Sequence, residues 1–369
     1  MSASDSAVAN DQTHAAEAFL NSLLDDRKTP GLQYVFADTD QVLFRFSGGY
    51  ADINEKIPVG NDTTFNGYSI TKTFTAAAVV KLASEGKVDL DEPISTYVDD
   101  FPYKQSPTVR QTLQHIGGFP NPNPMPWIHL AEEHETFDSR AFIEKVVHEN
   151  AELESEPGEK FAYSNIGYLL LGEVVRKASG MPYSAYVLAE IIDPLSLAED
   201  QRISFEIDQP QTHAHGYIRK WNWLNLALGW FIDRKTFLEP SVAGWVQFHE
   251  FLVNGAAYGG LVGTASGFVR YLQAALRVEK PFTQEILDLM WQTGTTLSGE
   301  SVRTGLAWRY GDLDGERYFG HTGGGGGYYC EIRAYADAKC ASVIMTNNTG
   351  ISNQHYLDRV DRYLLEKGD

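Results

Sequence analysis

Short apolar runs separated by turn residues occupy both ends of the chain, and this pattern predicts β-strands. Residues 31–37 and 42–50 form two such runs around a polar loop, which favours a hairpin. Four further runs near the other end predict strands over residues 304–310, 317–322, 327–335 and 340–347. Amphipathic helices are expected before the first strand, over residues 12–27, and after the last, over residues 353–366.

The middle of the chain has helical rather than strand periodicity. Small and apolar residues follow Lys72 without interruption until Gly86, which predicts a buried helix. Further helices are expected over residues 108–119, 138–150 and 282–291, and two more should end near Ser179 and Arg277, the second with Ser266 as its cap.

These patterns together predict an α+β fold. The strands of both ends can form one antiparallel sheet flanked by the N-terminal and C-terminal helices, with a large, mostly helical domain inserted between them. We therefore expect a sheet domain of residues 1–63 plus 261–369 and a helical domain of residues 64–260. A cleft between the two would be the natural place for a ligand.

Aromatic residues are concentrated between residues 221 and 251, which hold four of the seven tryptophans. One interpretation is a second hydrophobic cluster of the core. The other is an aromatic wall or lid beside a ligand pocket, because such pockets are mostly apolar. A subunit interface is a third possibility, and the sequence leaves all three open.

The net charge of the chain is −19, with an isoelectric point near 4.9. Such an acidic chain should be repelled by nucleic acids and by anionic membrane surfaces, so we expect neither as a partner. No run of about 18 apolar residues predicts a transmembrane helix. The polar N-terminus does not resemble a signal peptide, which favours a cytoplasmic protein unless the sequence has been trimmed.

The chain of 369 residues has two cysteines, Cys330 and Cys340. A hairpin turn between them would not place them opposite each other, so we expect free thiols and a reducing compartment. The ten histidines include no convincing metal-ligand cluster. We therefore expect neither a metal nor another cofactor.

The first candidate for chemistry is Ser69, three residues before Lys72. Positions i and i+3 share one face of a helix, so both side chains should point the same way from its first turn. A serine hydroxyl needs a base within hydrogen-bond reach, and a desolvated lysine can be that base. The alternative is a surface lysine near a helix start, because Ser-x-x-Lys also occurs by chance.

Two more candidates follow along the chain. Tyr163 precedes a predicted helix, and a tyrosine can act as a base or proton relay if a nearby cation lowers its pKa. The alternative is a buried tyrosine with a satisfied hydroxyl. His321 and Thr322 precede five glycines, which would let a substrate lie against the strand edge and leave an N–H free for an oxyanion. A flexible hairpin loop is the alternative there.

The order Ser69-x-x-Lys72, Tyr163-x-Asn165, His321-Thr322-Gly323 resembles the serine β-lactamase and penicillin-binding-protein-like superfamily. The resemblance covers nearly the whole chain and is strongest to the class C-like branch, which includes related carboxylesterases and D-stereospecific peptidases. It implies the β-lactamase/transpeptidase-like fold.

The resemblance also implies roles for individual residues. Ser69 would be the acylated nucleophile, and Lys72 and Tyr163 would share the base role. Asn165 would hold a substrate carbonyl or the lysine. The backbone N–H groups of Ser69 and Gly324 would form the oxyanion hole. The substrate would also meet three neighbouring residues of one strand: His321, Thr322 and Gly323.

One departure from the family pattern concerns His321, where class C β-lactamases usually carry lysine. A histidine is mostly neutral at pH 7 and should bind a substrate carboxylate less firmly. Another is the stretch His115-Ile116-Gly117-Gly118, where the family usually reads His-Thr-Ser-Gly; we take it as structural drift, with His115 as a helix-end residue.

We therefore expect a serine hydrolase that acts on small-molecule esters or amides, with a carboxylesterase favoured. The alternatives are a D-amino-acid-specific peptidase or amidase, a weak β-lactamase, and a non-catalytic homologue that keeps the fold as a scaffold. Fold alone does not separate them, because one scaffold hosts several chemistries. The oligomeric state is open.

Overall fold

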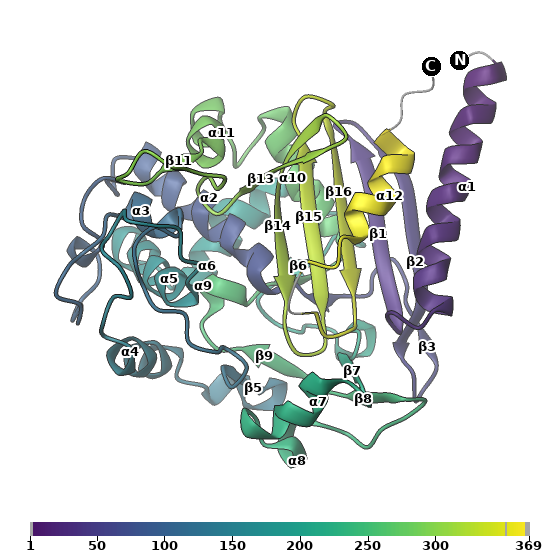
Figure 1. The fold of residues 1–369 in the computed structure, drawn as a ribbon, viewed down its shortest axis with the longest axis horizontal. Coiled ribbons are helices and arrows are strands. Elements are labelled where there is room, and N and C mark those ends of the chain that lie inside the picture. The colour runs from purple at the N-terminus through teal and green to yellow at the C-terminus, as the bar shows by residue number, and fades with distance from the viewer. Residues whose placement is uncertain (1–2, 351–352, 366–369) are drawn as a thin grey trace.

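Seven antiparallel strands form the central sheet of the computed structural model, which describes residues 3–350 and 353–365 (Figure 1). In spatial order they are β13 (Arg309–Leu313), β14 (Glu316–Gly324), β15 (Tyr329–Tyr335), β16 (Cys340–Thr346), β1 (Gly31–Asp38), β2 (Val42–Asp52) and β3 (Ile57–Pro58). The two ends of the chain meet where β1 pairs with β16, with Leu32 opposite Thr346 and Asp38 opposite Cys340. The predicted antiparallel sheet, built from both ends, is confirmed.

One predicted strand starts in the wrong place. Residues 304–308 were expected to be extended, but they form a turn in which the N–H of Gly305 donates to the carbonyl of Trp308. Ala307 lies in the left-handed region with a φ of 71°, which no strand accommodates. The strand β13 therefore begins only at Arg309, and this places Arg309 at the sheet edge.

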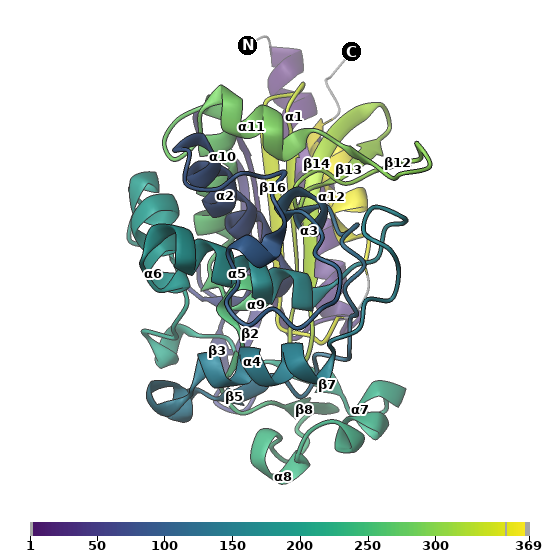
Figure 2. The same ribbon diagram turned by 90° about the vertical axis from the view of Figure 1, so that its left-hand side faces the viewer.

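Helices cover both faces of the sheet. The two terminal helices, α1 (Ala3–Asp25) and α12 (Tyr356–Leu365), pack together on one face, and α10 (Ala265–Arg277) packs on the other (Figures 1 and 2). The predicted flanking helices are confirmed. The predicted cap of α10 was wrong, because the side chain of Thr264 rather than Ser266 accepts the N–H of Gly267.

Most of the remaining helices form a layer beside the sheet, and Figure 2 shows this layer facing the viewer. They are α2 (Thr71–Ser84), α3 (Val109–Leu113), α4 (Ser139–Glu149), α5 (Asn165–Ser179), α6 (Tyr183–Val187), α9 (Ala256–Gly259) and α11 (Gln284–Trp291). Two short helices, α7 (Trp223–Ala227) and α8 (Arg234–Phe237), lie at one end of the molecule. Two-residue strands link them: β4 (Phe65–Asn66), β6 (Ile203–Ser204), β10 (Val262–Gly263), β11 (Gly294–Thr295) and β12 (Ser301–Val302). Four three-residue strands pair two by two: β5 (Ile128–Leu130) with β9 (Phe251–Val253), and β7 (Tyr217–Arg219) with β8 (Trp245–Gln247).

A single large hydrophobic core joins the sheet and the helical layer. It includes Val343 and Met345 from the sheet together with Val79 of α2 and Leu170 of α5, all of them buried. α2 is buried along almost its whole length, as its run of small and apolar residues predicts. The division into residues 1–63 plus 261–369 and residues 64–260 stays a prediction, since this core is shared by both parts.

Neither Cys330 nor Cys340 belongs to a disulfide, as expected, and both thiols are buried. In the register of β15 with β16, Cys330 lies opposite Met345 and Cys340 lies opposite Tyr335. The two cysteines therefore do not lie opposite each other. Within residues 3–350 and 353–365, none of the helices is both long and apolar enough to span a bilayer.

Candidate active site

Ser69 lies on a short turn that leads directly into a buried helix. The turn is a 3-10 helix over Tyr68–Ile70, and α2 begins at Thr71. Ser69 therefore precedes the α-helix rather than lying in its first turn, yet its Oγ is 3.0 Å from the Nζ of Lys72. Ser69 keeps some solvent exposure, whereas Lys72 is 0% exposed. The spacing of three residues thus brings an accessible hydroxyl to a desolvated amine.

Tyr163 reaches the same hydroxyl from a different part of the chain. Its phenol donates a hydrogen bond of 2.8 Å to the Oγ of Ser69. The loop that carries Tyr163 is anchored at the start of α5, because the side chain of the next residue, Ser164, caps this helix by accepting the N–H of Gly167. The structure therefore brings together the three residues predicted to carry the chemistry.

The amine of Lys72 is enclosed by acceptors and aromatic rings. Its Nζ is 2.9 Å from Oδ1 of Asn165 and 2.7 Å from the carbonyl of Tyr258. The rings of Tyr163, Tyr168 and Tyr258 lie within 5.1 to 5.3 Å of it. Burial, with a smaller contribution from the positive charge of Arg309, holds the pKa of Lys72 well below its usual value. Asn165 contacts the lysine, which is one of its two predicted roles.

Burial shifts the pKa of Tyr163 in the opposite direction to that of Lys72. It raises the pKa of the phenol to about 12, although the hydrogen bond with Ser69 and the charge of Arg309 lower it. The sequence-based condition for a tyrosine base, a pKa lowered by a nearby cation, is therefore not met overall. The lowered pKa of Lys72 raises the share of neutral amine, which can accept a proton, whereas the raised pKa of Tyr163 keeps the phenol protonated at neutral pH.

The glycine-rich end of β14 lies directly against the nucleophile turn. A Cβ on Gly323 would lie 2.1 Å from the carbonyl oxygen of Gly67 and 3.1 Å from the amide nitrogen of Ser69. Only glycine permits this approach. Thr322, Gly323 and Gly324 all line the pocket beside Ser69. The oxyanion hole formed by the N–H groups of Ser69 and Gly324 stays a prediction.

Tyr68 connects the turn to the glycines in a second way. Its φ of 47° is unusual for a residue other than glycine, and its hydroxyl donates to the carbonyl of Gly326 at 2.5 Å. The residue before Ser69 is thus strained and tethered, which fixes the direction of the nucleophile turn.

His321 does not take its expected place on the cleft wall. It is 3% exposed and is not among the described residues that line the pocket. Its Nδ1 is 2.7 Å from the carbonyl oxygen of Thr322, so the imidazole contacts the backbone of its own strand rather than the cavity. Burial, together with the charges of Arg309 and Lys72, lowers the pKa of His321 well below its usual value and keeps the ring neutral.

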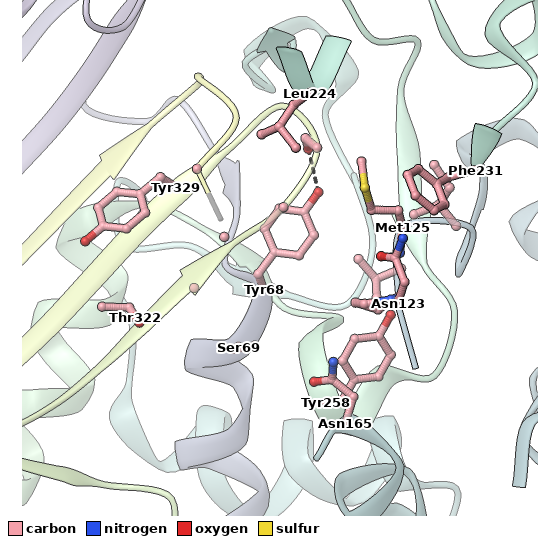
Figure 3. A pocket seen from close by; sticks show the side chains of 18 of the residues that line it. Tyr68, Ser69, Asn123, Met125, Asn165, Leu224, Phe231, Tyr258, Thr322 and Tyr329 are labelled. Carbon is pink, nitrogen blue, oxygen red and sulfur yellow. Dashed lines mark hydrogen bonds between the residues drawn. The ribbon is translucent and has the colours of Figure 1, made fainter. Parts of the chain in front are cut away.

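A cavity of about 640 Å³ opens beside Ser69. Figure 3 shows Thr322 and Tyr329 on one side of it and Met125 and Phe231 across from them. Much of its wall is apolar: Met125, Ile128, Leu224, Leu228, Phe231, Ile232, Phe248, Phe251 and Val253. The aromatic segment 221–251 therefore forms part of a ligand-pocket wall, and some of its members also belong to the core.

Arg309 is a functional candidate that sequence reasoning missed. It lines the pocket, it is exposed, and no acidic partner is found for it in the described part of the chain. Its guanidinium carbon lies 5.8 Å from the centre of the Tyr163 ring. The sequence offered no signal, because a single arginine in a short strand usually belongs to a solvated face.

His115 is a second residue whose place the sequence did not reveal. It is 4% exposed, and its ring packs against that of Tyr163 with centres 4.3 Å apart and planes tilted by 31°. Its Nδ1 accepts the N–H of Ser164 at 3.1 Å, and its carbonyl accepts the N–H of Ala162 at 2.7 Å. His115 therefore supports the loop that carries Tyr163 on both sides of that residue.

Comparison with known proteins gives consistent results. The family model described as Beta-lactamase matches residues 16–365. Penicillin-binding protein 4* of Bacillus subtilis (strain 168) is 25% identical over 318 residues, which are 84% of this chain and 66% of that protein. The chain thus spans slightly less than two thirds of this curated relative.

The solved structures with similar folds include the following two. An octameric penicillin-binding protein homologue from Pyrococcus abyssi is 25% identical with a TM-score of 0.73, over 95% of this chain and 76% of that one. D-amino acid amidase from Ochrobactrum anthropi SV3, complexed with D-phenylalanine, is 22% identical with a TM-score of 0.74. The second match covers 96% of this chain and 97% of the amidase.

Proposed function

The chain belongs to the beta-lactamase family, and from this premise we propose that it is a serine hydrolase that forms an acyl-enzyme on Ser69 and acts on esters. The single observation that carries the proposal is the contact of one hydroxyl with two proton-transfer groups. Oγ of Ser69 lies 3.0 Å from Nζ of Lys72 and 2.8 Å from the hydroxyl of Tyr163. This hydroxyl faces a pocket large enough for a small organic substrate.

The first step uses the lysine as base. A neutral amine has one lone pair and two N–H groups, so Lys72 can accept the Ser69 hydroxyl proton while it donates to Asn165 and Tyr258. The low pKa of Lys72 favours this neutral form. Ser69 then attacks the ester carbonyl, and the negative oxygen forms next to the backbone N–H groups of Ser69 and Gly324.

The second step uses the tyrosine as acid. Tyr163 is protonated and within hydrogen-bond reach of Ser69, so it can give its proton to the departing alkoxide. The proton held by Lys72 then restores the phenol. Water then attacks the acyl carbonyl while Lys72 accepts its proton; the bond from the carbonyl carbon to Oγ of Ser69 breaks, and Tyr163 gives its proton to Oγ, which releases the acid and restores Ser69.

Two features of the pocket favour an ester over the substrates of the related enzymes. Much of the wall is aliphatic or aromatic, which suits an apolar acyl or alcohol group. The described lining residues include Arg309 but no aspartate or glutamate. A free α-amine would therefore find a positive charge and no carboxylate partner, whereas a neutral or anionic ester avoids that conflict.

The second candidate is a D-amino-acid-specific amidase or peptidase. It is favoured by the likeness of the fold to D-amino acid amidase over 96% of this chain. A weak β-lactamase follows, because His321 is buried and neutral where a lysine usually stands. A non-catalytic scaffold is disfavoured by the intact contacts among Ser69, Lys72 and Tyr163.

Turnover of a small substrate panel by the purified chain tests the proposal. The panel holds p-nitrophenyl esters of increasing chain length, a D-alanyl p-nitroanilide and nitrocefin. We expect the esters to be cleaved fastest and Ser69→Ala to remove the activity. Ser84→Ala, an exposed serine at the other end of α2, is the matched control and should behave as wild type.

Two results would replace the proposal with an alternative. Faster cleavage of the anilide than of any ester would make the chain a D-peptidase or amidase. Failure of a fluorophosphonate probe to label Ser69 in the folded chain, together with no turnover, would favour the scaffold.

A further inference from the structure

The segment over residues 219–238 exposes five large apolar side chains to solvent, of which Phe231 is the least exposed at 40%. The exposed fractions of the other four are 86% for Trp221, 69% for Trp223, 73% for Leu226 and 84% for Trp230. We call these four side chains the outer face of the segment. Burying such side chains is strongly favourable, so several exposed together usually mark a contact surface. Figure 1 shows α7 and α8, which belong to this segment, at one end of the molecule beyond the sheet.

The same segment forms part of the pocket wall with its other side. Trp223, Leu224, Leu228 and Phe231 line the cavity beside Ser69, and two of them, Trp223 and Phe231, are also exposed to solvent. Trp221, Leu226 and Trp230 are exposed without lining the cavity. The segment is therefore a thin layer whose apolar groups face both the candidate active site and the solvent.

The charge of this segment is opposite to that of the whole chain. Arg219, Lys220, Arg234 and Lys235 are all exposed, and Asp233 is the one acidic residue of the segment. Four positive charges less one negative charge give +3, against −19 for the chain. The Nζ of Lys220 lies 5.7 Å from the centre of the Trp221 ring, so positive charge borders the apolar side chains directly.

We propose that the outer face of segment 219–238 docks the protein on an anionic lipid surface. Tryptophan and leucine on one face with lysine and arginine beside them are the composition of interfacial helices, in which the rings enter the headgroup region. Each basic residue near such a surface adds attraction to anionic lipids. The combination of exposed rings and local positive charge fits an anionic lipid surface better than it fits an uncharged apolar partner.

A second copy of the chain fits the outer face less well. In a two-fold symmetric contact the same patch meets itself, which would bring two surfaces of charge +3 together. An anionic lipid surface has the complementary charge. The sequence-based expectation of no membrane partner rested on net charge, but charges more than about 10 Å away are largely screened at physiological salt. The attraction of segment 219–238 to a lipid surface therefore depends on the charge of the segment more than on the net charge of the chain.

Docking would place the pocket wall against the lipid surface. A lipophilic ester could then pass from that surface to the cavity past Leu224 and Phe231. This delivery step rests on the proposed function, whereas the docking itself does not.

Flotation of the full chain with vesicles tests the docking. Vesicles of phosphatidylcholine, with and without phosphatidylglycerol, are the probes. We expect wild type to float with the anionic vesicles and to bind neutral ones more weakly. Trp221→Ser combined with Trp230→Ser should lose most binding to both. Lys220→Gln combined with Lys235→Gln should lose roughly ten-fold or more in binding to anionic vesicles, with little change for neutral ones.

Leu297→Ser is the matched control, because Leu297 is 77% exposed but lies outside the segment. It should float as wild type does. Trp221 and Trp230 do not line the pocket, so turnover of a soluble short-chain ester should be unchanged in their variant and reports that it is folded.

The proposal is overturned if wild type does not float with anionic vesicles, or if the tryptophan variant floats equally well. In that case, light scattering tests whether the outer face is instead an interface between copies of the chain. An oligomer that the tryptophan variant converts to monomers, without vesicle binding by wild type, would make the face an interface between copies. Vesicle binding without ester turnover would leave the docking intact and remove the proposed hydrolase function.

Discussion

The guanidinium carbon of Arg309 lies 5.8 Å from the centre of the Tyr163 ring, at the edge of the central sheet. The pair links β13 to the loop before α5 and places a positive charge beside Lys72 and Ser69. This charge lowers the pKa of Lys72 in addition to burial, and it partly offsets the effect of burial on the pKa of Tyr163. Arg309 thus acts on both proton-transfer groups.

Arg309→Gln should shift the acid limb of the pH–rate profile of kcat/KM to higher pH. A positive neighbour disfavours the protonated lysine, so its removal raises the pKa of Lys72 and leaves less neutral amine at a given pH. The activity that depends on neutral Lys72 rises as pH rises through this pKa. The loss should therefore be greatest at low pH and should fade as the pH is raised.

Arg303→Gln is the matched control for this measurement. Arg303 is exposed on the same turn but is not among the described pocket residues, so its variant should keep the wild-type profile. An acid limb that stays in place in Arg309→Gln would show that Arg309 does not influence the base.

Tyr163→Phe should reduce kcat by about 10² to 10⁴, the range expected for loss of a general acid or base. The ring and its contact with His115 remain, while the hydroxyl 2.8 Å from Ser69 is removed. Single-turnover kinetics with a p-nitrophenyl ester measures the effect on acylation. Tyr186→Phe removes another buried hydroxyl, one with no hydrogen-bond partner in the described chain, and should have little effect. A near-normal rate in Tyr163→Phe would exclude Tyr163 from proton transfer.

His115→Ala should lower kcat while leaving KM nearly unchanged. The change leaves the buried N–H of Ser164 without its acceptor, at a cost of about 1 to 3 kcal/mol, and removes the ring beneath Tyr163. His115 does not line the described pocket, so substrate binding is not touched directly.

His115→Phe separates the two roles of this residue. It keeps a ring under Tyr163 but not the acceptor for Ser164. A rate close to wild type in His115→Phe would assign the effect to the ring contact with Tyr163, and an equal loss in both variants would assign it to the hydrogen bond. A raised KM with unchanged kcat in either variant would contradict a positioning role.

The sequence revealed the fold and the central contact of the site because both depend on local patterns. Runs of alternating and buried residues predicted the sheet strands and α2, and the spacing from Ser69 to Lys72 predicted a shared direction. The role expected of Tyr163 came only from its order relative to the other motifs, on which the family resemblance rested.

What the sequence did not reveal depends on contacts between distant segments. Arg309 reaches Tyr163 only because the turn over residues 304–308 starts β13 late, and His115 reaches it through the packing of its ring. The burial of His321 depends on how β14 packs, and the exposure of Trp221 and Trp230 depends on which side of a thin wall they occupy. None of these contacts leaves a periodic signal in the chain.

Asp361 gives a prediction about stability rather than activity. This aspartate of α12 is 0% exposed, and its carboxylate accepts three hydroxyl groups from the sheet. The hydroxyls of Tyr34 and Tyr335 donate at 2.7 Å each, and that of Ser342 donates at 2.6 Å. The C-terminal helix is therefore tied to β1, β15 and β16 through one buried side chain.

Asp361→Ala should destabilise the fold by roughly 3 to 5 kcal/mol, because it leaves three buried donors without their acceptor. Asp361→Asn should cost less, since its amide oxygen still accepts. Urea unfolding followed by circular dichroism measures both, and Asp337→Ala provides the control. Asp337 pairs with Arg317 at the surface, where both side chains are more than half exposed, so its loss should cost about 1 kcal/mol or less. If Asp361→Ala were no more destabilising than Asp337→Ala, the carboxylate would not be what holds α12 to the sheet, and the packing of α1 against α12 would have to supply the anchor instead.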